Sequence, residues 1–395
     1  MTSVLVVDDS EFVRTVIGNA LSDHGYEVRE ASDGESAVRA VAEHDPDLVT
    51  MDVVMPGMDG IEAVDRIMSA NPTRILMLSA HTEAGADATL EALSKGAVDF
   101  LAKSGETVPG DAGTLAERVV EKLRAVERVD LSSVIAQRAA DRAAAAAQQT
   151  AAAASGGTAT VDAPAVDGPT VEPTAEPTAS PPTVDGDLSA ELAGDRPATP
   201  PTVVVGASTG GPKVVERILR ELPADLDARV LVVQHMPASF TGRLAARLDD
   251  LSTYDVREAA HGDVVGPGEA VVAKGEYHMR VVPTDGDDLQ LQLTEEKRRH
   301  GVRPAIDVTM ESAADAVDDG LVGVALTGMG RDGAAGIEAI HAAGGTTIAQ
   351  DEASSPVFGI PRKAIETGAV DAVLDARSMA AGIVDAATAD GDTDG

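Results

Sequence analysis

A serine in the C-terminal half of the chain has the surroundings of a hydrolase nucleophile. Ser208 lies in Gly206-Ala-Ser-Thr-Gly210, between an apolar run and an amphipathic run. The G-x-S-x-G elbow of hydrolases needs this strand–turn–helix context, because a sharp turn exposes the hydroxyl. The backbone N–H of Thr209, at the start of the expected helix, would then face a developing oxyanion. A phosphate-binding loop is the alternative for these glycines, but the segment around Ser208 matches neither phosphate-loop pattern.

A histidine and an aspartate follow other apolar runs. A nucleophilic serine needs a general base and an acid that orients the base. His235 directly follows Val230–Gln234, and Asp332 comes shortly after Gly323–Leu326. The carboxyl ends of parallel strands collect at one edge of a sheet. We therefore expect Ser208, His235 and Asp332 to meet and to form a triad for acyl transfer.

Two members of this triad have alternatives. His278 and His300 are rival bases, and spacing alone does not exclude them. Asp332 could instead cap the helix expected over Gly333–Ala342. The chain order Ser, His, Asp differs from the Ser, Asp, His order of α/β-hydrolases, which disfavours that fold.

Three carboxylates in the N-terminal part of the chain predict a cation site. Asp8 and Asp9 end the first apolar run and Asp52 ends the third. In a 2-1-3-4-5 sheet these strands are neighbours, and carboxylates that close together are unfavourable unless a cation joins them. Oxygen ligands without Cys or His suit Mg²⁺, and Ser79 and Lys103 end the next runs on the same edge, so Asp52 could form an acyl phosphate. The alternative is that the acids and the serine only cap the helices that follow.

Two blocks of alternating strand and helix patterns must position these residues. In the first block the expected strands are Val4–Asp9, Glu27–Ala31, Asp47–Val53, Arg74–Ala80 and Asp99–Lys103. In the second block they are Thr202–Val205, Arg229–Gln234, Ala270–Ala273, Leu321–Leu326 and Thr346–Gln350. This alternation predicts two α/β domains with parallel sheets, the first flavodoxin-like with strand order 2-1-3-4-5 and the second doubly wound.

The composition changes sharply between and after the two blocks. We expect a first domain over 1–125, an Ala-, Pro-, Thr- and acid-rich linker over 126–200, a second domain over 201–388 and an acidic tail over 389–395. The Ala-rich start of the linker could be helical, but the rest lacks the apolar residues that a packed core needs.

Composition also narrows the functions that these domains could have. The 395 residues include 31 Lys and Arg against 66 Asp and Glu, a net charge of −35, which argues against nucleic acid as a partner because phosphate neutralisation needs clustered cations. The absence of cysteine excludes disulfides, thiolate zinc ligands and thiol nucleophiles. No apolar run is long enough for membrane insertion, so we expect a cytoplasmic protein. The acidity is typical of a halophile, whose salt-rich cytoplasm screens self-repulsion.

The first domain resembles a response-regulator receiver domain over its full length. The resemblance rests on Val-Val-Asp8-Asp9-Ser, Met-Asp52-Val-Val-Met-Pro-Gly-Met-Asp-Gly60, Leu-Ser79-Ala and Phe100-Leu-Ala-Lys103. It implies that Asp52 is the phospho-acceptor and that Asp9 and Asp52 ligate Mg²⁺, with Asp8 beside them. The implied switch residues are Ser79, Phe100 and Lys103. A chemotaxis histidine kinase is the implied phosphodonor.

The second domain is similar to the chemotaxis receptor methylesterases of the CheB family. The shared motifs are Gly206-Ala-Ser-Thr-Gly-Gly211, Gln234-His-Met-Pro237, Arg303-Pro-Ala-Ile-Asp307-Val, Leu326-Thr-Gly-Met-Gly-Arg-Asp-Gly-Ala-Ala-Gly336 and Gln350-Asp-Glu-Ala-Ser with Phe358-Gly-Ile-Pro-Arg362. The similarity implies that Ser208 is the nucleophile, His235 the general base and Asp332 its orienter. It also implies the backbone N–H of Met329 as an oxyanion donor. Such enzymes hydrolyse glutamate methyl esters on the cytoplasmic helices of chemoreceptors, release methanol and often deamidate glutamines there, without a cofactor for the esterase.

Together the two resemblances predict a phosphorylation-activated hydrolase that acts on chemoreceptors in chemotactic adaptation, with no insertion in the membrane. The alternative is a phosphorylation-switched binding module whose hydrolase-like domain is inactive. Intact Ser208, His235 and Asp332 argue against that alternative, and methanol release from methylated receptors would decide between the two.

Overall fold

The structure is a computed structural model in which residues 1–80, 83–103, 112–132, 134–135, 138–139, 199–283, 288–318 and 320–388 are described. Most of the expected linker and the whole expected tail therefore lie outside the described residues. The described residues within 1–138 and 199–388 belong to one compact unit.

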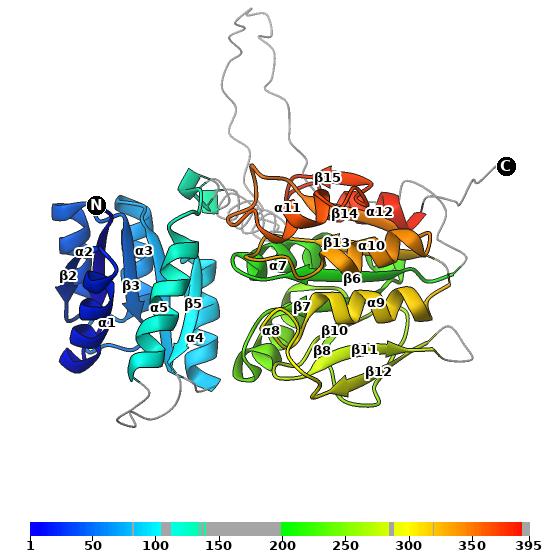
Figure 1. The fold of residues 1–395 in the computed structure, drawn as a ribbon, viewed down its shortest axis with the longest axis horizontal. Helices are drawn as coiled ribbons and strands as arrows, with labels where there is room; N and C mark the ends of the chain where they lie inside the picture. The colour runs from blue at the N-terminus through cyan, green and yellow to red at the C-terminus, as the bar shows by residue number, and fades with distance from the viewer. Residues whose placement is uncertain are drawn as a thin grey trace, which may run out of the picture. The chain divides into compact units, whose positions relative to one another are not determined.

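The N-terminal domain is built on a five-stranded parallel sheet in the order β2-β1-β3-β4-β5, which confirms the predicted topology (Figure 1). Its elements are β1 (Ser3–Val7), α1 (Glu11–Asp23), β2 (Glu27–Ala31), α2 (Gly34–His44), β3 (Leu48–Asp52), α3 (Gly60–Ala70), β4 (Arg74–Ala80), α4 (Glu83–Ser94), β5 (Asp99–Lys103) and α5 (Ala112–Val126). In the ladder Val7 of β1 lies opposite Met51 of β3. The residues that follow β1 and those that end β3 therefore share one edge of the sheet.

The C-terminal domain has a seven-stranded sheet in the order β15-β14-β13-β6-β7-β10-β8, and every pairing in it is parallel. Its strands are β6 (Thr202–Ala207), β7 (Arg229–Gln234), β8 (Asp255–Glu258), β10 (Glu269–Val272), β13 (Leu321–Ala325), β14 (Thr346–Gln350) and β15 (Ala372–Leu374). Strand β6 is central, with β13 on one side and β7 on the other. The ladders place Ala207 opposite Gln234 and Gly206 opposite Ala325. The loops that follow these three strands are therefore neighbours.

Both faces of this sheet are covered, which explains why its central strands β6, β7 and β13 are continuous apolar runs. One face packs on α7 (Gly211–Glu221), α8 (Ala238–Leu251) and α12 (Met379–Thr388). The other packs on α9 (Ile306–Ala316), α10 (Ala334–Ala342) and α11 (Ile360–Ile365). Successive residues alternate between the two cores, so Val203 and Val205 belong to the first and Val204 to the second.

A small antiparallel sheet, β11-β12-β9, adds to the second core (Figure 1). Its strands are β9 (Val264–Val265), β11 (His278–Val282) and β12 (Leu289–Thr294), and a 3-10 helix, η1 (Ala224–Leu226), precedes β7. Across the described ranges of the chain, no helix is both long enough and apolar enough to span a bilayer.

Candidate active site

Ser208 lies on a tight turn between β6 and α7. Its backbone N–H donates to the Thr327 carbonyl at 3.0 Å, and its own carbonyl accepts from Gln234 Nε2 at 2.8 Å. Gly210 has a φ of 77°, a backbone conformation that residues with a side chain rarely adopt, so the turn needs glycine there. A Cβ on Gly328 would come within 2.7 Å of Ser208 Cβ. Neighbouring strand ends thus fix the elbow from both sides.

The structure brings His235 and Asp332 together as the sequence predicts. His235 follows β7, and its Nε2 lies 2.8 Å from Asp332 Oδ2. Both side chains are mostly buried, 11% and 3% exposed. In this pairing Nε2 carries the proton that Asp332 accepts, so Nδ1 is the ring nitrogen left to act as a base.

Asp332 is held in its ionised form. Burial disfavours its charged form, but the hydrogen bond and charge of His235 and the N–H groups of Asp307 and Ile306 outweigh burial and lower its pKa. Those two N–H groups, in the first turn of α9, donate to the two carboxylate oxygens at 3.0 and 2.7 Å. An ionised Asp332 stabilises an imidazolium at His235, which general-base catalysis requires.

One cavity of about 530 Å³ gathers the predicted hydrolase residues. Ser208, Thr209, His235, Met329 and Asp332 all line it. In the described residues His235 has Asp332 as its side-chain partner, and Ser208 makes no hydrogen bond to that ring. Within the same described ranges, the backbone N–H groups of Met329 and Thr209 have no acceptor. Two unpaired N–H groups beside a serine form the arrangement that can stabilise an oxyanion.

Of the two rival histidines, His278 is buried and His300 lies at the cavity. His278 is 1% exposed; its Nδ1 accepts from the Ala305 N–H at 3.2 Å and its Nε2 donates to the Lys297 carbonyl at 3.2 Å. This pairing uses both ring nitrogens, so His278 holds the backbone together and is no base. His300 lines the same cavity as Ser208.

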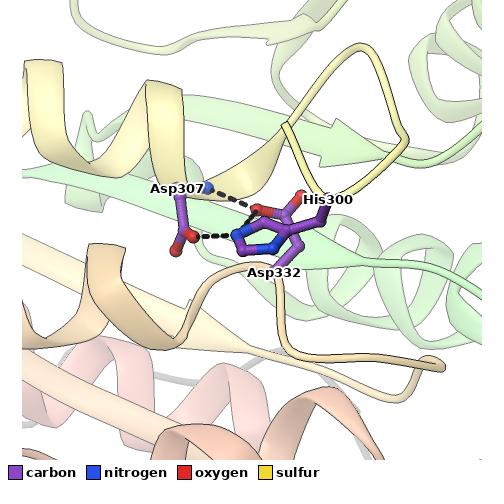
Figure 2. Close-up of side chains that lie close together, drawn as sticks. All are labelled: His300, Asp307 and Asp332. Atoms are coloured by element: carbon purple, nitrogen blue, oxygen red, sulfur yellow. Dashed lines mark hydrogen bonds and ion pairs between the residues drawn. The ribbon is translucent and has the colours of Figure 1, made fainter. Parts of the chain in front are cut away.

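The alternative that Asp332 caps the helix over Gly333–Ala342 is wrong, because Asp332 caps a different helix, α9. Asp332 accepts from the first turn of α9, whereas Asp307 Oδ1 accepts from Gly333 and Gly336, at the start of α10, at 2.8 and 2.9 Å. Asp332 therefore caps the helix that carries Asp307, and Asp307 caps the helix that follows Asp332. Figure 2 shows the bond from the Asp307 N–H to the Asp332 carboxylate. The sequence motifs assigned Asp307 no role, although an acid in the first turn of an expected helix was a usable signal.

The acids of the N-terminal domain also converge. Asp8, Asp9 and Asp52 each place a carboxylate oxygen within 4.8 Å of the other two. They do not cap the helices that follow, because Ser10 caps α1 and Asp59 caps α3. Lys103 Nζ lies 2.7 Å from Asp8 Oδ2 and 2.8 Å from Asp52 Oδ1.

The negative charge of this acid cluster exceeds the positive charge that Lys103 supplies. Burial raises the pKa of Asp52, with Asp8 adding to the effect, against the lowering by Lys103. Burial also opposes the charged form of Lys103, but Asp52 and Asp8 outweigh it and raise its pKa. One ammonium facing three carboxylates does not neutralise them, and the donor set of carboxylate oxygens is the one that Mg²⁺ prefers. The cluster therefore fits a divalent cation.

Of the predicted switch residues, Ser79 and Lys103 end β4 and β5 at the edge that carries Asp52, whereas Phe100 is near the start of β5. Ser79 is fully buried, and its Oγ donates to the Gly85 carbonyl at 2.9 Å. Phe100 is 7% exposed and stacks on Phe240 of α8, with ring centroids 4.4 Å apart. Lys103 is the one of the three that contacts Asp52.

Further contacts of the same compact unit reach the serine elbow. Thr209 Oγ1 donates to Asp99 Oδ2 at 2.7 Å, directly beside Ser208. Asp99 is next to Phe100 in β5 and also pairs with Lys122 Nζ at 2.6 Å. Leu101, Lys122 and Arg118 line the cavity that Ser208 lines. The strand that ends in Lys103 thus touches the residue after the candidate nucleophile.

Comparisons with known proteins support both resemblances, the receiver domain and the methylesterase domain. A family model described as CheB methylesterase matches residues 203–383, and one described as response regulator receiver domain matches residues 4–108. A protein of Haloarcula marismortui named protein-glutamate methylesterase/protein-glutamine glutaminase is 46% identical over 385 residues, 97% of each chain. One of Natronomonas pharaonis with the same name is 48% identical over 384 residues, again 97% of each chain.

Among solved structures, the Thermotoga maritima CheB methylesterase catalytic domain is similar at 38% identity and a TM-score of 0.46, covering 48% of this chain and 99% of that one. The relatives from Haloarcula and Natronomonas match both domains and nearly the whole length of the chain. This protein therefore belongs to the family of protein-glutamate methylesterases/protein-glutamine glutaminases that carry a response-regulator receiver domain.

Proposed function

We propose that this protein hydrolyses glutamate methyl esters on the cytoplasmic helices of chemoreceptors and releases methanol. The observation that carries the proposal is the buried His235–Asp332 pair, which lines one cavity with a serine on a strand–turn–helix elbow. Relatives that align over 97% of both chains carry the corresponding name. The reaction adjusts receptor sensitivity in chemotactic adaptation and takes place in the cytoplasm.

The chemistry follows from the geometry of the pair. Ser208 Oγ attacks the ester carbonyl carbon while Nδ1 of His235 takes the hydroxyl proton, because Nε2 is bonded to Asp332. The carbonyl oxygen becomes an oxyanion that the N–H groups of Met329 and Thr209 stabilise. The imidazolium then protonates methoxide, which leaves as methanol.

Water completes the cycle by the same route. His235 takes a proton from water, the hydroxide attacks the acyl-serine carbonyl, and Ser208 leaves with the proton from the imidazolium. The product is a glutamate carboxylate on the receptor. A glutamine side chain would react alike and release ammonia, more slowly because an amide nitrogen leaves less readily than methoxide.

The N-terminal domain supplies phosphorylation control. Asp52 accepts a phosphoryl group from a chemotaxis histidine kinase, and Asp9 and Asp52 hold Mg²⁺ with Asp8 beside them. Mg²⁺, when bound, neutralises charge on the phosphoryl oxygens. Ser79 and Lys103 hold the phosphoryl oxygens at the same edge, and Phe100 belongs to the switch.

Without phosphorylation, the N-terminal domain covers the Ser208 edge. Support comes from the Asp99–Thr209 hydrogen bond and the Phe100–Phe240 ring pair, which both start from the strand that ends in Lys103. Phosphorylation shifts the population toward an uncovered state.

The test is methanol release from methylated receptor membranes, with and without a small-molecule phosphodonor. Ser208→Ala should lose on the order of 10⁶ in rate, as triad knockouts do, while it still binds receptor. Asp52→Asn should keep the basal rate and lose the response to phosphodonor. Substantial methanol release by Ser208→Ala would refute the nucleophile, and full stimulation of Asp52→Asn would refute the phospho-acceptor.

A further inference from the structure

His300, one of the two rival bases, lines the cavity and pairs with Asp307, and the proposed triad gives it no role. Its Nε2 lies 2.7 Å from Asp307 Oδ2 and 4.0 Å from Asp332 Oδ1, and its side chain is 30% exposed (Figure 2). We propose that His300 is a positioning residue, which acts through Asp307 to fix the carboxylate of Asp332 against His235. The proposal rests on the function proposed above.

The backbone conformation at His300 is unfavourable for histidine, which indicates that the imidazole side chain has a function at this position. Arg299 and Val302 form an isolated antiparallel bridge, and the two residues between them have φ values of 53° and 81°. Two positive φ angles define a type I′ turn, in which Asn-Gly is the preferred pair. Gly301 fits that preference, whereas His300 adopts a conformation that favours glycine or asparagine. A residue kept in an uncommon conformation beside a functional cavity suggests that its side chain has a function there.

Asp307 connects His300 to the triad through two helix termini. Its Oδ1 accepts from Gly333 and Gly336, so it fixes the start of α10 directly after Asp332. Asp332 in return accepts from the N–H groups of Ile306 and Asp307. A shift of Asp307 therefore moves the segment that carries Asp332 and also the donors that orient its carboxylate.

His300 is the ring that holds the other oxygen of Asp307. Arg299 faces the same Oδ2 at 3.5 Å but makes its close hydrogen bonds to Glu311 instead. His300, Asp307 and Asp332 also have the donor types of a metal site. Their carboxylate oxygens, however, already accept from four backbone N–H groups and two imidazoles, so this cluster is a hydrogen-bonded support rather than a cation site.

Loss of the imidazole should act on the rate and leave binding unchanged. His235 makes the close bond to Asp332, whereas the His300 ring lies 4.0 Å from that carboxylate and pairs with Asp307, so we assign the proton of Ser208 to His235. A displacement of about 1 Å at a catalytic group can cost on the order of a hundredfold in rate. We therefore expect kcat to fall on the order of ten- to a hundredfold while KM for methylated receptor stays unchanged.

The experiment compares His300→Asn with His300→Gln in the full chain. Asparagine is the preferred residue for this turn, so His300→Asn should keep or raise the thermal unfolding midpoint while kcat falls. The longer amide side chain of the His300→Gln variant can donate an N–H toward Asp307 and should restore part of kcat. Asp45→Asn is the matched control, since Asp45 is also a non-glycine residue with positive φ, 44°, in the other domain. It should leave kcat unchanged.

A second measurement does not need turnover. The proton between His235 and Asp332 should give a low-field ¹H NMR resonance in the wild type, and His300→Asn should shift or broaden it. Wild-type kcat and an unshifted resonance in His300→Asn would overturn the proposal. Failure of the proposed function would appear differently, as an unchanged rate in Ser208→Ala, whatever His300→Asn does.

Discussion

At the scale of single residues, the candidate site is held by carboxylates that do two tasks. Asp332 orients His235 and also receives the first turn of α9, while Asp307 receives the first turn of α10. Neither helix has a capping side chain of its own at its N-cap residue, Ala305 or Gly333. The same hydrogen bonds that stabilise the helices therefore fix Asp332, the proposed orienter of the general base. Substitutions at these residues should change stability and activity together, unlike substitutions at Ser208.

Asp99 provides a prediction about control at the residue scale. Asp99→Ala removes the acceptor of the Thr209 hydroxyl, so the uncovered state should become more populated and unphosphorylated enzyme should release methanol severalfold faster. Asp87→Ala is the control, because the Asp87–Arg243 pair, at 3.6 Å, is solvent-exposed and worth little. An unchanged basal rate in Asp99→Ala would contradict the covering contact.

At the scale of elements, the sequence predicted every strand that carries a site residue, but not every strand of the molecule. All ten strands expected from apolar runs correspond to strands of the two parallel sheets. Five short strands were missed, among them β8 and β15 at the edges of the large sheet. A strand buried on both faces is a continuous apolar run, whereas an edge strand of three or four residues gives no such signal. In β12 the alternation Leu-Gln-Leu-Gln-Leu was a usable signal for a half-buried strand.

The junction of β13 with the serine elbow allows a packing prediction. A Cβ at position 328 would lie 2.5 Å from Ile360 Cδ1 and 2.7 Å from Ser208 Cβ. Gly328→Ala should therefore cost about 1–3 kcal/mol of unfolding free energy and lower kcat by displacing Ser208. Gly242→Ala, in α8, is the control, because its Cβ would meet only the flexible Glu258 side chain at 3.6 Å. Equal stability and rate in both variants would show that the strand end can adjust.

His278, the first residue of β11, predicts a pH dependence of stability. Burial lowers the pKa of His278, with the charge of Arg303 adding to the effect, so the folded protein favours the neutral ring. The unfolded chain has an ordinary histidine pKa of about 6.5. Below that pH the unfolded state binds more protons, so the stabilising contribution is fully present above about pH 6.5 and is lost as pH falls through the lower folded pKa.

Unfolding midpoints between about pH 7.5 and pH 5 test this dependence. His278→Gln keeps a donor and an acceptor at the site but does not protonate, so its stability should fall less with acidification than that of the wild type. His261→Gln, at an exposed histidine, should follow the wild type. Parallel pH curves for wild type and His278→Gln would contradict the assignment.

At the scale of the whole molecule, the large negative net charge should make stability depend on salt. A net charge of −35 on 395 residues repels itself, and salt screens that repulsion over a Debye length of about 3 Å at 1 M. The protein should therefore unfold at a higher temperature in about 1 M KCl than in about 0.1 M KCl. Sucrose at equal osmolality is the control, since it does not screen charge. A midpoint that falls with added salt would contradict the prediction of a halophilic protein.

The sequence by itself determined the two parallel α/β domains, the sheet order of the first and the strand ends at which Asp8, Asp9, Asp52, Ser208 and His235 lie. It could do so because apolar runs mark buried strands locally, and because the carboxyl ends of parallel strands always share one edge of their sheet. Only the tertiary structure showed that both ring nitrogens of His278 are occupied and that His300 pairs with Asp307, and only it showed that Asp307 caps α10 and Asp332 caps α9. Those contacts join segments more than 20 residues apart, and their hydrogen-bond partners are backbone groups, which look the same at every position of a sequence.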